Sequence, residues 1–175
     1  YIALTARRWP GKARWRAEKI AEGAWHDVRA YDADDLEQWL GQAAAVRLAF
    51  GEELGLSGAG VDSIGAYLEK WGAQCTPRIT PAALLTGRGD KATKLIQRVG
   101  DIHDGSAIEP LAIKADSVEE AAAFAAAAIL EQPNLANVAV VVTSVEGWRF
   151  VEANETIGIA VAATPFIAEA PSVRD

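Results

Sequence analysis

The sequence contains no methionine, one cysteine and two histidines in 175 residues. A single cysteine, Cys75, excludes an intramolecular disulfide framework and is typical of a reducing compartment, so we expect a cytoplasmic protein. No run approaches the ~20 uncharged apolar residues that a membrane-spanning helix needs, so we expect no membrane contact. Because the chain lacks an initiator methionine and opens inside a strand-like apolar run, we expect it to be a fragment of a larger protein.

Patterns for catalysis and for metal binding are also missing. His26 and His103 are far apart in the sequence and lack the spacing of metal ligands. Cys75 has no CxxC partner, and nothing places a histidine base beside it. The acidic residues within 32–37 could be interpreted as a metal site, but acids in the first turn of a helix are expected from the helix dipole. We therefore expect no catalytic residue, no metal and no cofactor.

The charge is distributed unevenly along the chain. The formal net charge is −7, which argues against wholesale wrapping by nucleic acid. Residues 1–30 nevertheless carry a net +4, which leaves −11 for the remainder. Five basic residues interleaved with Trp9 and Trp15 have the composition of a phosphate-contact patch, although a solvated amphipathic helix has the same composition. These candidate nucleic-acid-binding residues are Arg7, Arg8, Lys12, Arg14 and Arg16.

The first third of the chain predicts a short β-α-β piece. Tyr1–Thr5 and Asp27–Tyr31 have the apolar or alternating character of strands. Lys12–Ala21 between them has apolar residues on one side and charges on the other, as an amphipathic helix does. Asp32 is a good N-cap for the helix that follows.

Residues 32–99 predict a helical middle. Leu36, Trp39 and Leu40 have the i, i+3, i+4 spacing of a buried stripe. Helices are then expected over Ala43–Leu54, Val61–Gln74 and Lys91–Val99, with a short one from Pro81 to Leu85. In the first of these, the apolar residues are spaced by four and share one face; they are Val46, Phe50 and Leu54.

The final third predicts a parallel βαβαβ sheet. Strands are expected at Ile108–Ala115, regular from Leu111 because Pro110 interrupts it, at Val138–Thr143 and at Ile157–Ala163. A helix follows each of the first two strands. The whole chain therefore predicts an α/β protein with a first domain at residues 1–75 and a second at 76–175.

The junction before the alanine-rich helix has the position of a phosphate loop but different residues. Ser117 and Glu120 have the spacing of a capping box. Together with Asp116 and Glu119 they occupy the place where a glycine-rich loop and a lysine would be needed, and the three carboxylates disfavour an added phosphate. Thr143-Ser144 is a second position at which a small ligand could bind, and helix capping explains it equally well.

The sequence resembles two known protein families. The first resemblance is to the C-terminal end of a restriction-endonuclease-like domain of the PD-(D/E)xK type, found in bacterial defence proteins. It rests on Leu4-Thr5, Arg8-Trp9, Lys12, Trp15, Trp25 and the run from Asp27 to Leu40. That family needs an Asp and a Glu-x-Lys to hold Mg²⁺. Since no Glu-x-Lys occurs here, the resemblance implies that the catalytic half lies upstream of Tyr1 and that this chain does not cut DNA.

The second resemblance covers Leu84 to about Phe166 and is to a P-loop NTPase module of the signal-transducing type. Gly87-Arg88 matches the family's approach to its first helix, and residues 111–115 fall where the strand before the phosphate loop lies. The glycine-rich loop and its lysine do not match. The resemblance therefore implies a degenerate NTPase-like core without its phosphate loop.

These observations predict a non-catalytic scaffold or sensor fragment of a larger bacterial protein. Its expected partners are the other domains of that protein, with DNA as an additional candidate. Two alternatives stay open: a nucleic-acid-binding surface at the N-terminal basic residues, and a nucleotide-binding module with an atypical phosphate loop.

Overall fold

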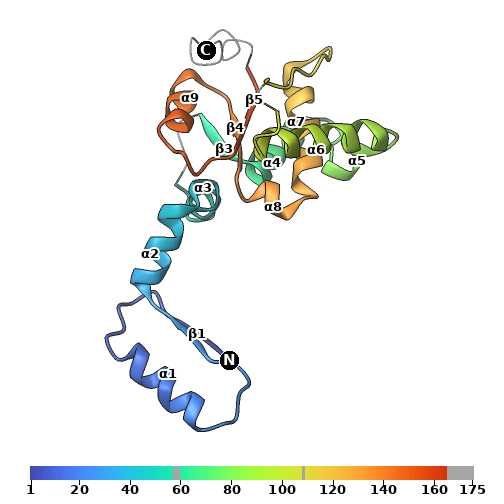
Figure 1. Cartoon of the computed structure of the whole chain (residues 1–175). Coiled ribbons are helices and arrows are strands. Elements are labelled where there is room, and N and C mark those ends of the chain that lie inside the picture. Colours follow the sequence, from blue (N-terminus) through green and yellow to red (C-terminus); the bar gives the residue numbers. More distant parts are fainter. Residues whose placement is uncertain (57–59, 108, 165–175) are drawn as a thin grey trace. The chain divides into compact units, whose positions relative to one another are not determined.

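The computed structural model describes residues 1–56, 60–107 and 109–164, and shows a mixed α/β chain (Figure 1). The predicted start of a strand at Ile108 and the expected limit of the second resemblance near Phe166 lie outside these residues. The chain forms two compact units, Tyr1–Gln42 (unit 1) and Ala43–Asp175 (unit 2). The domain boundary predicted after residue 75 falls inside unit 2.

Unit 1 contains the predicted β-α-β piece followed by one helix. Its elements in order are β1 (Ile2–Leu4), α1 (Lys12–Ala21), β2 (Arg29–Tyr31) and α2 (Ala33–Gln42). β1 and β2 pair in parallel with Ala3 opposite Ala30. The stripe expected on α2 is only partly covered, because Leu36 and Leu40 are half-buried whereas Trp39 is exposed and contacts the edge of the Tyr31 ring.

The outer edge of β1 has no strand beside it in the part of unit 1 that the structure describes. The N–H of Arg29 donates to the carbonyl of Tyr1 (2.9 Å), and the N–H of Thr5 donates to the carbonyl of Tyr31 (3.1 Å). Backbone groups alternate in direction along a strand, so those of Ile2 and Leu4 point to the outer edge. The Ile2 and Leu4 residues are also 66% and 61% exposed.

A polar network joins the two helices of unit 1. The Lys12 ammonium group donates to Asp32 Oδ1 (2.8 Å) and to Asp35 Oδ2. The backbone N–H of Trp9 donates to Asp32 Oδ2 (3.0 Å), and Asp32 is almost fully buried. Asp32 and Asp35 also each accept the other's backbone N–H (3.4 and 2.9 Å). This confirms Asp32 as the N-cap of α2, with Asp35 as its reciprocal partner three residues later.

The described part of unit 2 holds the remaining helices and three short strands. Its elements in order are α3 (Ala44–Glu53), β3 (Val61–Ser63), α4 (Ile64–Gln74), α5 (Pro81–Leu85), α6 (Gly89–His103), α7 (Val118–Leu130), α8 (Pro133–Ala136), β4 (Ala139–Val142), α9 (Val145–Glu152) and β5 (Ile159–Ala162). The predicted short helix at Pro81–Leu85 is confirmed, and Thr80 caps it, since Thr80 Oγ1 accepts the N–H of Ala83 (3.3 Å). α6 continues to His103, four residues past the predicted end.

The sheet of unit 2 is mixed, with strand order β3-β4-β5, so the prediction of a parallel βαβαβ sheet is wrong in its first strand. β4 and β5 are parallel and joined by α9, as predicted. Residues 111–115 form no strand, and Leu111 and Ile113 are exposed. The place beside β4 is taken instead by Val61–Ser63, which was predicted as the start of a helix and pairs antiparallel with β4.

The core of unit 2 is built around α7. All eight residues from Ala122 to Ile129 are buried, and α4, α5, α6, α8, β4 and β5 contact this helix. On one side its alanines pack in a cluster with Ile64, Leu68 and Val141, and on another Phe124 packs with Leu95 and Val99. Six of the eight buried residues are alanine, so the neighbouring elements can approach the helix backbone closely.

We expect Ala126→Val to lower the free energy of unfolding by about 1–3 kcal/mol, because the added methyl groups overpack a closed core. Ala82→Val on the exposed face of α5 is the matched control, and should cost less than about 0.7 kcal/mol through helix propensity alone. Urea unfolding followed by circular dichroism measures both changes. Equal costs at the two positions would contradict the central placement of α7.

Unit 1 should lose stability in acid because of Asp32. The Lys12 ammonium group, and next the Trp9 N–H, hold the pKa of Asp32 well below its usual value. A carboxyl group with a lowered folded-state pKa stabilises the fold above its unfolded pKa of about 3.9, and that stability is lost as the pH falls below this value. Urea unfolding followed by tryptophan fluorescence should therefore occur at lower urea at pH 3 than at pH 6.

The variant Asp32→Asn should weaken this pH dependence, since it removes the titrating group. Asp34→Asn is the control, because Asp34 pairs with Arg8 in an exposed bridge that is expected to contribute little. Fluorescence reports mainly on unit 1, which holds four of the six tryptophans. A pH dependence that is the same in the wild type and in Asp32→Asn would show that another group is responsible.

Candidate functional site

The N-terminus of α7, where the sequence places a degenerate phosphate loop, is capped by its own side chains. The N–H of Glu120 donates to Ser117 Oγ (3.2 Å), and the Ser117 hydroxyl donates to Glu119 Oε2 (2.8 Å). The Glu120 carboxylate pairs instead with Arg88 (2.9 Å). The Ser117 cap is thus confirmed, whereas the Glu120 carboxylate pairs with Arg88, the residue before α6.

Negative charge remains fixed at this helix end. The backbone N–H of Glu119, and next the Ser117 hydroxyl, lower the pKa of the Glu119 carboxyl group, which favours its charged form. Asp116 is exposed beside it, in a segment without regular secondary structure. Because like charges repel, an incoming phosphate is disfavoured here, and the geometry is that of a structural N-cap.

The second candidate position, Thr143-Ser144 after β4, is also used for capping. Ser144 Oγ accepts the N–H of Gly147 (3.0 Å), and the N–H of Thr143 donates to the carbonyl of Gly60 (2.8 Å). A Cβ atom on Gly60 would lie 1.9 Å from Ser144 Oγ, so the Gly60 backbone is in direct contact with this hydroxyl. Capping therefore accounts for Ser144, whereas Thr143 is held through its backbone N–H.

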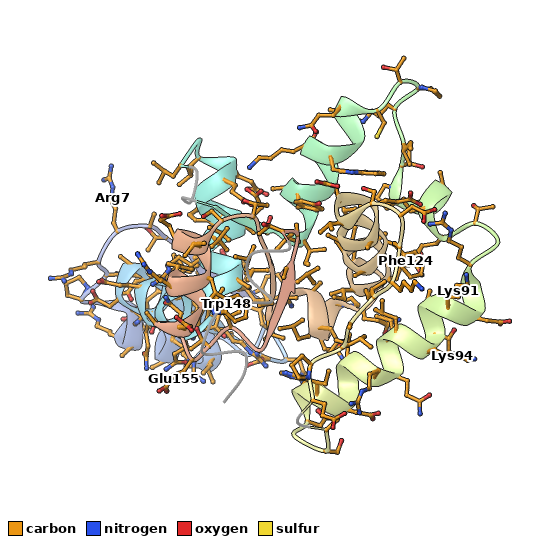
Figure 2. All side chains as sticks on the ribbon, turned by 90° about the horizontal axis from the view of Figure 1, so that it is seen from above. Arg7, Lys91, Lys94, Phe124, Trp148 and Glu155 are labelled. Atoms are coloured by element: carbon orange, nitrogen blue, oxygen red, sulfur yellow. The ribbon has the colours of Figure 1, made fainter. Side chains whose placement is uncertain are left out.

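Four of the five basic candidates in unit 1 have partners within the unit. Lys12 contacts Asp32 and Asp35 as described above. Arg8 pairs with Asp34 (3.0 Å), Arg14 with Glu18 (2.9 Å), and Arg16 donates to the Val28 carbonyl (2.9 Å). Arg7 is exposed, and its side chain extends away from the ribbon (Figure 2).

The charges of unit 1 also balance one another. The unit holds seven Lys and Arg residues and seven Asp and Glu residues, so its formal charge is zero. The net +4 of residues 1–30 is offset by the acids at 32–37, four of which lie in or beside α2. The candidate patch stays a prediction, and it lies in an electrically balanced unit.

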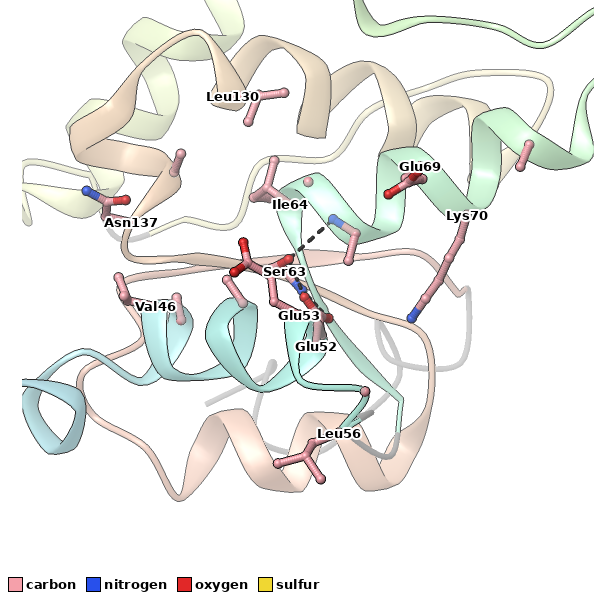
Figure 3. Close-up of a pocket in the computed structure, with 17 residues that line it drawn as sticks. Val46, Glu52, Glu53, Leu56, Ser63, Ile64, Glu69, Lys70, Leu130 and Asn137 are labelled. Carbon is pink, nitrogen blue, oxygen red and sulfur yellow. Dashed lines mark hydrogen bonds between the residues drawn. The ribbon is translucent and has the colours of Figure 1, made fainter. Parts of the chain in front are cut away.

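A groove of about 940 Å³ lies in unit 2, and sequence reasoning missed it (Figure 3). Figure 3 shows α3 with Val46 on one side of it and the end of α7 with Leu130 on another. Small and apolar residues make up most of its wall. They include Ala45, Val46, Ala49, Leu56, Ile64, Ala66, Ala73, Leu130 and Ala136.

The apolar face of α3 that the sequence singled out leads from this groove to the surface. Val46 lines the groove, and Phe50 and Leu54 are 51% and 63% exposed. Leu56, which also lines the groove, is 66% exposed. The side of α3 that packs inward carries Ala45 and Leu48 instead, so the four-residue spacing marks a surface stripe.

The polar side chains of the groove are mostly engaged in structural contacts. Glu52 accepts the backbone N–H of Ser63 (3.0 Å) and the Ser63 hydroxyl, while Ser63 Oγ accepts the N–H of Ala66 at the start of α4 (3.2 Å). Glu69 lies 3.6 Å from Arg78. Glu53 is exposed on α3. The groove is therefore an apolar channel with acidic groups at its margin.

Other features of the described residues, and the comparisons with known proteins, assign no further site. No group of three or more His, Cys, Asp or Glu residues within 1–56, 60–107 and 109–164 is arranged to hold a metal ion. Each described helix is too short or too polar to cross a membrane. Comparison with protein-family models, curated proteins and solved structures found no match. The two resemblances accordingly stay predictions.

Ser117→Ala should lower the free energy of unfolding by about 1 kcal/mol, because it removes the acceptor for the Glu120 N–H. Ser117→Asn should retain most of the stability, since asparagine caps helices equally well. Chemical unfolding of the three proteins measures the difference. If both variants matched the wild type, Ser117 would have no capping role and the helix end would be free to bind another group.

Proposed function

We propose that this chain is a non-catalytic scaffold or sensor module of a larger protein, and that its α3–α4 groove receives an apolar segment of a partner domain. The observation that carries the proposal is the groove itself, with Val46, Leu56 and Leu130 exposed along it. Apolar surface gathered in a groove is typical of sites that bind a helix or an extended segment. Each additional Å² of apolar surface covered there stabilises the complex by about 25 cal/mol before the costs of association.

The margin of the groove indicates the chemistry of that segment. Glu53 is exposed on α3, Glu69 is exposed on α4 and lies 3.6 Å from Arg78, and Lys70 is paired with Asp62. An amphipathic helix with an apolar face and basic flanking residues would bury its apolar face against Val46 and Leu130. Its basic residues would then meet the acids at the margin, which favours recognition and orientation.

Unit 1 supports the same function with an independent surface. The outward backbone groups of Ile2 and Leu4 lie on a free strand edge, and both side chains are exposed. Parallel strands normally lie in sheets that are covered on both faces, so a two-stranded parallel pair is suited to joining further strands. A strand from another domain could add to β1 through backbone hydrogen bonds.

The non-catalytic part of the proposal rests on how the polar side chains are used. Ser117 and Ser144 cap helices, Glu52 holds the start of α4, and Asp32 joins the helices of unit 1. Within the described residues these groups are committed to the fold. Nucleotide binding at Asp116–Glu120 is the less favoured alternative, because the acids there repel phosphate.

The groove can be tested with Val46→Glu, which places a charge in its wall, and Gly65→Leu, which fills it. A Cβ atom on Gly65 meets no other atom within 4 Å, so the fold should accept the larger side chain. We expect both variants to reduce co-purification with the remaining domains of the parent protein, supplied as a separate polypeptide, by tenfold or more. Affinity capture followed by quantitative mass spectrometry measures the loss.

Val145→Glu is the matched control, because Val145 is an exposed valine of the same unit outside the groove. It should leave co-purification unchanged. The proposal fails if the groove variants bind as the wild type does, or if the gene encodes no further domain with which the chain can associate. Circular dichroism of each variant establishes that the fold is retained.

A further inference from the structure

Four basic residues recur along one flank of α6. Arg88 precedes the helix, and Lys91, Lys94 and Arg98 follow at spacings of three, three and four residues. These spacings bring side chains to neighbouring positions on one side of an α-helix. The buried residues Leu95 and Val99 face the core beside them, so this flank lies at the boundary between core and solvent.

The concentration of positive charge here is exceptional within unit 2. Residues 88–98 carry a net +3, whereas the rest of unit 2 carries −10. Four of the ten basic residues in the unit's sequence fall in this segment, and Asp90 is its single acid. The segment is therefore a short basic stretch within an otherwise acidic unit.

Arg88, the first of these four basic residues, is held by contacts within the fold. Arg88 pairs with Glu120 (2.9 Å) and lies 5.9 Å from the centre of the Phe124 ring. For Lys91, Lys94 and Arg98 the structure shows no ion pair with any of the residues it describes. Lys91 and Lys94 are exposed on α6 (Figure 2), and Arg98 is half-buried.

We propose that Lys91, Lys94 and Arg98, the α6 basic row, bind the phosphate backbone of nucleic acid. An α-helix rises 1.5 Å per residue, so the row spans roughly 10 Å. One strand of B-DNA has a phosphate about every 3.4 Å of axis, so each of the three side chains can contact a different phosphate of the same strand. This surface is separate from the basic candidates of unit 1, most of which have partners within that unit.

An acidic protein segment is the competing partner, and the surface around the row disfavours it. Protein segments usually add apolar contacts to charged ones. No large apolar residue of α6 is exposed, since Leu95 and Val99 are buried and Ile96 and Ile102 are half-buried. A contact made by charge alone is suited to the regular phosphate backbone of a nucleic acid. It predicts binding that does not depend on the nucleotide sequence.

The binding should be weak and steeply dependent on salt. Three phosphate contacts predict a slope of log K against log salt concentration of about −2.7 for duplex DNA and about −2 for a single strand. The acidic remainder of unit 2 opposes the approach of any polyanion, so binding should be measurable at low salt and lost near 200 mM.

The test uses the whole chain and a fluorescently labelled 20-base-pair DNA duplex, followed by anisotropy from 20 to 200 mM salt. The variant K91Q/K94Q/R98Q should weaken binding at 20 mM salt at least tenfold and remove most of the salt slope. Glutamine has nearly the helix propensity of lysine, so α6 should persist, which circular dichroism verifies. R7Q/R8Q/R14Q in unit 1 removes the same charge and should change binding less than threefold.

Three outcomes would overturn the proposal. The first is no binding of the wild type to duplex or single-stranded DNA at 20 mM salt. The second is loss of binding in the unit 1 variant with retention in the α6 variant, which would assign the contact to Arg7, Arg8 and Arg14. The third is tighter binding of a labelled poly-glutamate peptide than of DNA, which would identify an acidic protein segment as the partner.

Discussion

Eight consecutive residues of α7, Ala122–Ile129, are removed from solvent on every side, and the rest of unit 2 is arranged around them. A helix that is apolar all round has to be surrounded by other elements, because any exposed face would leave apolar surface in water. The alanines make this feasible, since α4, α5 and α6 can each approach the α7 backbone. The position of α7 in turn fixes α4 and Leu130, and these form one side of the groove.

The same packing accounts for the contacts at the N-terminus of α7. Ser117 and Glu119 interact with each other at this helix end, and Glu120 is held by Arg88 of the segment that leads into α6. The junction is thus a contact between two structural elements. Function is proposed instead for surfaces that the core leaves uncovered, namely the groove beside α3 and the basic flank of α6.

Local signals in the sequence were sufficient for the described helices other than α8 and for the strands β1, β2, β4 and β5. Thr80-Pro81 and Ser117 mark helix starts by capping, and Asp32 does the same in unit 1. The buried run at Ala139–Val142 identified β4 by its unbroken apolar character.

The errors concern interactions between residues far apart in the sequence. Leu111 and Ile113 are apolar, as strand residues often are, but the strand that pairs with β4 is Val61–Ser63. No local sequence pattern indicates which segment pairs with β4. The sequence shows the four-residue spacing of Val46, Phe50 and Leu54. This spacing does not tell which side of α3 faces the core. The groove requires α3, α4 and Leu130 together, so it could only be found in the folded chain.

The central claim is that the groove, and not the start of α7, is the binding surface of this chain. Hydrogen–deuterium exchange of the chain alone, with ATP and Mg²⁺, and with the other domains of its parent protein tests this claim most directly. The account predicts slower exchange within residues 44–53 and 64–74 when the other domains are present, and no change at residues 114–120 with ATP. Protection of residues 114–120 by ATP, with no change in the groove segments, would contradict it.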